Sequence, residues 1–301
     1  MIATRGARVA LVVAGLLCSG APAVRGQPAA GPTYAEVFYP SGKLRIQAYL
    51  FRPDGAGPFP TVIYNHGSRP PARERQSVPF EHIGRLLTRA GYAVLVTERR
   101  GYGRSDGPTW SQEVGAESRR VVPRLEAETD DVLAALPYLG TLPFVDSKRL
   151  GVMGWSFGGI VTLFAVSRSH EFLAAVDQAG GALTWNGNPA IRSALAAAAG
   201  RVTTPMLLLV SENDRTTESI TAVGDVLERR GIAHRVVIYP PFGSGRNLGA
   251  GTPGHQVFSA QGMSVWEQDV LEFLGRHLRD GGGPRGKPAP HPALSPEGRG
   301  G

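Results

Sequence analysis

Short apolar runs rich in β-branched residues alternate with longer amphipathic stretches along the chain. The apolar runs predict eight strands, at Tyr34–Tyr39, Leu44–Arg52, Thr61–Asn65, Ala93–Thr97, Leu150–Gly154, Ala174–Gln178, Met206–Ser211 and Arg235–Tyr239. The longer stretches predict helices at Phe80–Ala90, Arg124–Leu139, Phe157–Ser169, Ile191–Ala199, Ser219–Arg230 and Ser264–Leu278, with stops at Gly91, Gly140, Gly200 and Gly231. This alternation indicates an α/β protein with a mainly parallel sheet, opened by an antiparallel pair of strands.

The N-terminal segment departs from this pattern. Arg5 and Arg8 precede an apolar run from Val9 to Cys18, and small residues ending in Ala21-Pro22-Ala23 follow it. This order of charged, apolar and small residues is typical of a secretory signal peptide. The run is also shorter than the roughly 20 residues that cross a bilayer. We therefore expect residues 1–26 to be a cleavable signal peptide and the mature protein to be secreted or periplasmic, without stable membrane insertion.

Cys18 is the only cysteine. An intrachain disulfide is therefore excluded, and cleavage near residues 23–27 leaves a mature chain without cysteine. Lipid attachment at Cys18 is an alternative, although the preceding Gly15-Leu16-Leu17 places a bulky leucine where bacterial lipoprotein signals have a small residue.

The C-terminal segment also lacks the alternating pattern. Residues 281–301 contain little that is apolar and many glycines and prolines. Such a segment buries too little surface to offset the entropy lost on ordering, so we predict a disordered tail. No linker or repeat divides the remainder, and residues 30–280 are expected to form one domain.

Composition narrows the function classes. Hydrophobic residues make up 42% and charged residues 19% of the chain, values typical of a globular protein. The formal net charge is +7, carried almost wholly by arginine. These arginines are scattered or paired, and they do not alternate with aromatic residues as in single-strand binding platforms. We therefore expect no nucleic-acid partner.

The clearest chemical motif is Gly154-Trp155-Ser156-Phe157-Gly158, which follows an apolar strand and precedes a helical stretch. A Gly-x-Ser-x-Gly segment in this context is typical of a sharp strand-to-helix turn that exposes a nucleophilic serine at the edge of a sheet. Glycines on both sides allow neighbouring chain to pass close to that turn. Ser156 is therefore the candidate nucleophile.

A serine nucleophile requires a histidine base and a carboxylate that orients it. In this architecture the acid follows the serine in the chain, in a loop after a later strand. Asp214 fits best, in the loop after Met206–Ser211. Glu212 is an alternative, but it lies closer to the strand end, and Asp177 at the end of the sixth strand is a further one.

The base is expected in the loop after the last strand, where Gly254-His255 occurs. His255 is therefore the candidate base. Other histidines follow the serine, but His234 begins the last strand at the wrong end, His277 lies late in the last helix, and His291 lies in the tail.

A tetrahedral intermediate requires preorganised backbone donors for its oxyanion. The N–H of Phe157, which follows the nucleophile, is one candidate. The N–H of Ser68, after Asn65-His66-Gly67 at a strand end, is the second, with Gly67 and Arg69 as alternatives. His66 is expected to shape this loop, because a base there precedes the serine.

The chain resembles the α/β-hydrolases, in particular the dienelactone hydrolases and the catalytic domains of prolyl oligopeptidases. The resemblance rests on Asn65-His66-Gly67, on Glu98-Arg99-Arg100-Gly101-Tyr102-Gly103-Arg104-Ser105, on Gly154-Trp155-Ser156-Phe157-Gly158-Gly159, on Asp214 and on Gly254-His255. It implies an α/β-hydrolase fold with an eight-stranded, mostly parallel sheet. Only Gly180 to Gly200 is available after the sixth strand, so no large lid is expected.

The resemblance implies a serine hydrolase, and two departures narrow it. Dienelactone hydrolases use a cysteine nucleophile where this chain has Ser156, and prolyl oligopeptidases carry a β-propeller before the catalytic domain, which we do not expect here. We predict hydrolysis of a small-molecule carboxylic ester through an acyl-serine. A peptidase or amidase, an acyltransferase and an inactive binding protein on this scaffold are the alternatives. No His, Cys or carboxylate cluster has metal-ligand spacing, so no metal or other cofactor is expected.

Overall fold

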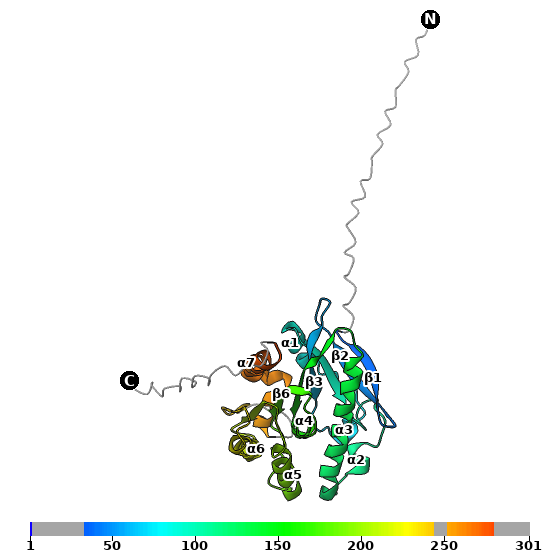
Figure 1. Ribbon diagram of the computed structural model, residues 1–301. Coiled ribbons are helices and arrows are strands. Elements are labelled where there is room, and N and C mark those ends of the chain that lie inside the picture. Colours follow the sequence, from blue (N-terminus) through cyan, green and yellow to red (C-terminus); the bar gives the residue numbers. More distant parts are fainter. Residues whose placement is uncertain (2–32, 244–251, 280–301) are drawn as a thin grey trace. The chain divides into compact units, whose positions relative to one another are not determined.

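The computed structural model describes residues 1, 33–243 and 252–279 (Figure 1). The chain divides into two units, Met1–Pro32 and Thr33–Gly301, and apart from Met1 all described residues belong to the second. The predicted signal peptide at 1–26 and the predicted tail at 281–301 therefore lie outside the described residues, Met1 excepted.

Eight strands form a single sheet, as the apolar runs predict. Their order is β1-β2-β4-β3-β5-β6-β7-β8, with β1 and β2 antiparallel to their neighbours and the others parallel. The bounds are β1 Ala35–Ser41, β2 Leu44–Phe51, β3 Phe59–Asn65, β4 Ala93–Glu98, β5 Val145–Trp155, β6 Phe172–Gln178, β7 Met206–Ser211 and β8 His234–Tyr239. Strands β4 and β7 are buried along their whole length, which explains the apolar runs that make up most of each strand.

Each predicted helix is present, and its ends differ from the prediction by a few residues. The bounds are α1 Glu81–Arg89, α2 Trp110–Glu113, α3 Val121–Gly140, α4 Phe157–Arg168, α5 Pro189–Ala199, α6 Glu218–Arg229 and α7 Met263–Leu274. The short helix α2 was not predicted, and the last predicted helix ends as a π-helical turn at Gly275–Arg279. Among the described residues, no helix is both long enough and apolar enough to cross a membrane.

The helices cover both faces of the sheet (Figure 1). Helices α3, α4, α5 and α6 pack against one another in chain order. The Cα of Gly154 faces α4 at Thr162, whereas that of Gly151 faces Leu274 and Leu278 at the C-terminal end of the chain's last helix. Positions an odd number apart in a strand point to opposite faces, so α4 and α7 lie on opposite sides of β5. Helix α1 lies beside α7, since the two line one groove.

One of the predicted helix stops, Gly140, is wrong. Gly91 and Gly231 follow α1 and α6 with φ of 85° and 67°, the left-handed conformation that ends a helix. Gly140 is instead the last residue of α3, where the Thr141 hydroxyl bonds the Tyr138 carbonyl. Gly200 follows α5 with φ −60°, so that helix ends without a left-handed residue.

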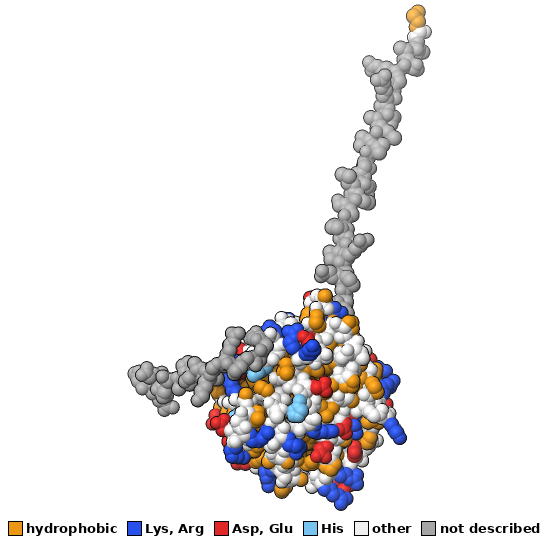
Figure 2. Space-filling view, viewed as in Figure 1, with side chains coloured by type: hydrophobic (Ala, Val, Ile, Leu, Met, Phe, Trp, Pro, Cys, Tyr) orange, Lys and Arg blue, Asp and Glu red, His pale blue; other side chains and the backbone are white. Residues whose placement is uncertain are grey.

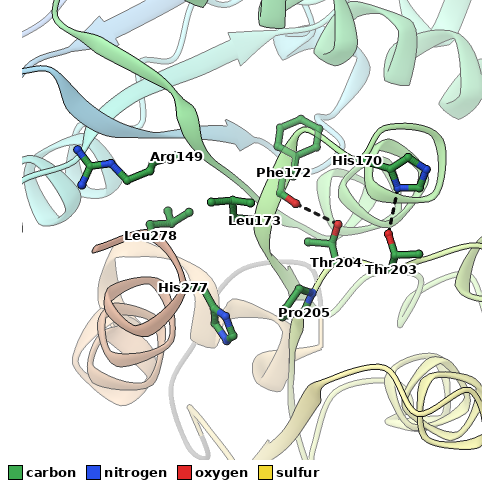
Figure 3. Close-up of a pocket in the computed structure, with 9 residues that line it drawn as sticks. All are labelled: Arg149, His170, Phe172, Leu173, Thr203, Thr204, Pro205, His277 and Leu278. Atoms are coloured by element: carbon green, nitrogen blue, oxygen red, sulfur yellow. Dashed lines mark hydrogen bonds between the residues drawn. The ribbon is translucent and has the colours of Figure 1, made fainter. Parts of the chain in front are cut away.

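The surface carries charges of both signs. Figure 2 shows basic and acidic side chains interspersed over one face, without a continuous basic area on that face. A cavity of about 400 Å³ lies where β6 and β7 begin, lined by Phe172, Leu173, Thr204, His277 and others (Figure 3). It is at the opposite edge of the sheet from Ser156, which follows the end of β5.

A buried carboxylate lies at the end of β6, beside the turn between β5 and α4. Asp177 accepts a hydrogen bond of 2.8 Å from the Gly180 N–H, and the Cα atoms of Gly159 and Gly180 pack directly against its carboxylate. Burial raises the pKa of Asp177 to about 7, although the hydrogen bond from Gly180 opposes this rise. Between pH 3.8, the ordinary pKa of an aspartate, and about pH 7, the unfolded chain therefore releases a proton that the folded chain retains. The free energy of unfolding therefore falls as the pH rises through that range.

We expect Asp177→Asn to remove this loss, because the amide oxygen still accepts from the Gly180 N–H and does not ionise. The variant should gain roughly 3 kcal/mol of unfolding free energy relative to the wild type between pH 5 and pH 8. Guanidinium unfolding of both proteins at the two pH values measures this. A difference between the proteins that is the same at pH 5 and pH 8 contradicts the prediction.

Candidate active site

Ser156 lies in a sharp turn between β5 and α4. Strand β5 ends at Trp155 and α4 begins at Phe157, so the serine alone makes the change of direction. Its φ of 60° and ψ of −120° are strained for a residue with a side chain. Its N–H donates to the Gln178 carbonyl at 2.8 Å, which ties the turn to the end of β6. This is the geometry that exposes a serine hydroxyl at the carboxyl edge of a parallel sheet.

Both flanking glycines are required by close backbone contacts. A Cβ on Gly154 would overlap the Gly158 carbonyl, and a Cβ on Gly158 would overlap the carbonyl of Asn65 at the end of β3. The turn therefore packs backbone on backbone against the neighbouring strand. Any side chain at Gly158 would push α4 away from β3.

His255 and Asp214 are brought together by two loops. Asp214 follows β7, and His255 lies in a 3₁₀ turn at Pro253–Phe258. The His255 Nδ1 is 2.8 Å from the Asp214 Oδ2, and both residues are buried. The Cα of Gly254 packs against the backbone nitrogen of Asp214, so the two loops touch through main chain as well. Because an ionised carboxylate can only accept, this hydrogen bond puts a proton on Nδ1.

The other ring nitrogen of His255 is free for chemistry. In the described part of the chain, Nε2 is buried and has no hydrogen-bond partner. The imidazole lies against the Trp155 ring, with centroids 5.5 Å apart, and Trp155 directly precedes Ser156. The base candidate, the acid candidate and the serine therefore lie at the same edge of the sheet.

The alternative acids and bases lie in other surroundings. Glu212 is exposed, and Asp177 faces the Gly159 and Gly180 backbone. His234 bonds the Ile232 carbonyl at the beginning of β8, and His277 packs on the Phe273 ring. His291 lies outside the described residues.

The candidate oxyanion donors lie beside the serine. Phe157 is the first residue of α4, so its N–H has no partner within the helix. On the other side, a Cβ on Gly67 would be 3.0 Å from the Ser156 Cβ and 3.7 Å from its Oγ. Ser68 follows Gly67 and is exposed. The loop after β3 thus passes directly over the serine.

The residues around this loop form a buried charged network that the sequence indicated only in part. Arg99 donates to the His66 carbonyl at 2.8 Å and to Glu128 of α3 at 2.7 Å. Arg124 donates to the same Glu128 at 2.9 Å. The i,i+4 pair of Arg124 and Glu128 within one predicted helix was a signal in the sequence that was missed. Arg100, the next residue of the motif, pairs with Asp131 of α3 at 2.8 Å.

His66 takes part in packing, as expected for a residue that shapes the loop. Its ring lies between Phe80, parallel at 5.9 Å, and Tyr102, edge-on at 4.6 Å. Burial, together with the charges of Arg69 and Arg99, holds its pKa well below 6.5. His66 is therefore neutral at physiological pH.

One aromatic pair lies at the mouth of the site. The Trp110 and Phe157 rings are 4.7 Å apart and only partly buried, so they form an apolar wall next to the serine. In the described part of the chain, no three His, Cys, Asp or Glu side chains are grouped as metal ligands would be.

Comparisons with known proteins bear on the family and the fold. The model of the "Prolyl oligopeptidase family" matches residues 79–188. The quorum-quenching protein AidA of Acinetobacter baumannii is 27% identical over 143 residues, which cover 48% of this chain and 42% of that protein. The matched stretches cover less than half of the first curated relatives.

Solved structures share the fold over most of the chain. Pyrococcus horikoshii acylaminoacyl peptidase superposes with a TM-score of 0.63 and 20% identity, covering 81% of this chain and 41% of the peptidase. The dienelactone hydrolase of Anabaena variabilis gives 0.57 and 22%, covering 82% of this chain and 100% of the hydrolase. Together with the eight-stranded sheet of the described residues, these similarities show that the chain has the α/β-hydrolase fold, and residues 79–188 are similar to the prolyl oligopeptidase family.

Proposed function

We propose that this protein is a serine hydrolase that cleaves small carboxylic esters, with Ser156 as nucleophile, His255 as base and Asp214 as the carboxylate that orients the base. The observation that carries the proposal is the 2.8 Å hydrogen bond between His255 and Asp214 beside the strained serine. It leaves the buried Nε2 as the acceptor for a serine proton.

The reaction follows from these positions. The Ser156 Oγ attacks the ester carbonyl carbon while its proton passes to the His255 Nε2. The N–H groups of Phe157 and Ser68 donate to the oxyanion that develops. The intermediate collapses when the C–O bond to the alcohol breaks, and His255 returns the proton to the departing alcohol. Water then attacks the acyl-serine with His255 again as base, and the carboxylic acid leaves with Ser156 restored.

Two observations support esters as the substrate class. The similar dienelactone hydrolase is covered over its whole length by this fold, whereas the similar peptidase is covered over less than half. An alkoxide is also a better leaving group than an unprotonated amide nitrogen, which would leave as an anion, so ester cleavage demands less proton transfer from the site. The match to the prolyl oligopeptidase family makes a peptidase or amidase the second candidate.

We expect a fluorophosphonate to form an adduct at Ser156 in the purified wild type and none in Ser156→Ala. Intact-mass analysis followed by peptide mapping measures this. Ester hydrolysis should fall by about 10⁶-fold in the variant, as when a triad nucleophile is removed. A folded wild type that forms no adduct would contradict the proposal and favour an inactive binding protein.

We expect Asp214→Asn to lower kcat by about 10⁴-fold with little change in KM, because the amide no longer fixes the proton of His255 on Nδ1. Glu212→Gln, two residues earlier in the same loop but exposed, is the matched control and should retain activity within a few-fold. Steady-state kinetics on a p-nitrophenyl ester compare the two. The reverse ranking of these variants assigns the acid to Glu212.

Esters should be preferred over anilides with the same acyl group by at least about 100-fold in kcat/KM. Matched p-nitrophenyl esters and p-nitroanilides measure the ratio. Equal or better cleavage of the anilide makes the protein a peptidase or amidase. Transfer of the acyl group to an added alcohol in preference to water, which forms a new ester, identifies a transferase.

A further inference from the structure

The loop that carries the Ser68 N–H is held by His66, which precedes Ser68 by two positions, and by Arg69, which follows it. The Arg69 guanidinium lies 2.8 Å from the Glu98 Oε2, and the His66 Nε2 lies 3.5 Å from the same oxygen. His66 and Glu98 are fully buried, and the Arg69 side chain is 8% exposed. One carboxylate oxygen therefore faces both ends of the segment in which Ser68 lies.

The same two side chains fasten this loop to the segment that leads into α1. The other oxygen of Glu98, Oε1, accepts from the Val78 N–H at 2.8 Å. Arg69 donates through its second terminal nitrogen to the Gln76 carbonyl at 2.7 Å. The Arg69–Glu98 pair and these two hydrogen bonds thus connect residues 66–69 to residues 76–78.

Because of where the neutral His66 ring carries its proton, ionised Glu98 and protonated Glu98 interact favourably with different partners. The His66 Nδ1 is 2.6 Å from the Gly67 carbonyl, which can only accept, so Nδ1 carries the proton of the neutral ring. Nε2 then presents a lone pair to the Glu98 Oε2. An ionised Glu98 is attracted to Arg69 and repelled by this lone pair, whereas a protonated Glu98 can donate to His66 and gains little from Arg69.

We propose that Glu98 is a positioning residue of the oxyanion hole: its ionised carboxylate, paired with Arg69, holds the Ser68 N–H where the oxyanion develops. The inference rests on the proposed hydrolase function. It concerns the rate of the chemical step, because Glu98 itself is buried away from substrate. Loss of the pair therefore lowers kcat and leaves KM nearly unchanged.

This pairing depends on pH. Burial raises the pKa of Glu98 to about 7, against the lowering effects of Arg69, the Val78 N–H and Arg99. The groups that face Glu98 from the loop after β3 are His66 and Arg69, and Arg99 follows it in its own loop. From β2, Tyr49 is the titratable neighbour, and its pKa is raised to about 12 by burial, so it stays neutral. The Glu98 carboxylate therefore forms as the pH rises through about 7, and above that pH its pairing with Arg69 holds the loop after β3 in place.

The test is Glu98→Gln in the full chain, assayed on a short-chain p-nitrophenyl ester from pH 5.5 to 8.5. Glutamine resembles the protonated acid, since its carbonyl accepts from Val78 and its amide donates to His66. We expect the wild-type to variant ratio of kcat to be near 1 at pH 5.5 and to rise to about tenfold or more above pH 8. Glu98→Asp, which keeps the charge, should recover most of kcat.

Asp131→Asn is the matched control. Asp131 is equally buried and pairs with Arg100 at 2.8 Å, but its carboxylate accepts from Ser41 and Arg100 and so joins α3 to β1 and to the start of the loop after β4. Its kcat should follow the wild-type pH profile even if its stability falls. A Glu98→Gln ratio that is constant with pH, a change confined to KM, or an equal loss in Asp131→Asn overturns the inference. Fluorophosphonate labelling of wild-type Ser156 tests the hydrolase proposal separately, so its failure is distinguished from that of the Glu98 inference.

Discussion

The turn between β5 and α4 is the constraint on which the rest of the site depends. Gly158 lies against the carbonyl of Asn65, and this leaves Ser156 in a strained conformation that the surrounding strands hold in place. The same contact sets the first turn of α4 and the loop after β3 at fixed positions on either side of the serine. Backbone packing, more than any side chain, therefore brings the candidate nucleophile and the candidate oxyanion donors together.

Buried ion pairs hold in place the loops that this backbone packing does not fix. Arg99 and Arg124 share Glu128 in the interior, and desolvation of such groups costs several kcal/mol per ion. Their attraction offsets this cost without a clear net gain in stability. Their contribution is to fix the conformation of the loops, because the arginines also donate to the carbonyls of His66, Arg100 and Pro108. These carbonyls belong to irregular loops, and a buried carbonyl without a donor is itself unfavourable.

The fold was predictable because its signals are local. All eight strands were found from apolar runs, and the order Ser156, Asp214, His255 follows from which loops come after which strands. The sequence did not reveal that Arg99 and Arg100 find their acids on α3, since those pairs span about 30 positions. The end of α3 was misjudged because Gly140 retains helical geometry while Thr141 provides the cap. Pairings across the fold depend on how the elements pack, which a periodic pattern does not encode.

Scaffold and specificity are therefore determined by different parts of the chain. A peptidase and a dienelactone hydrolase both share this sheet at about 20% identity, although their names imply cleavage of different bonds. The turn, the sheet edge and the loops after the strands are the parts of this chain that sequence patterns reveal. The Trp110 and Phe157 wall comes partly from the irregular region between β4 and α3, which no periodic pattern predicts. For the proposed serine hydrolase, discrimination between ester and amide must therefore come from side chains of such regions, because the machinery for attack is common to both reactions.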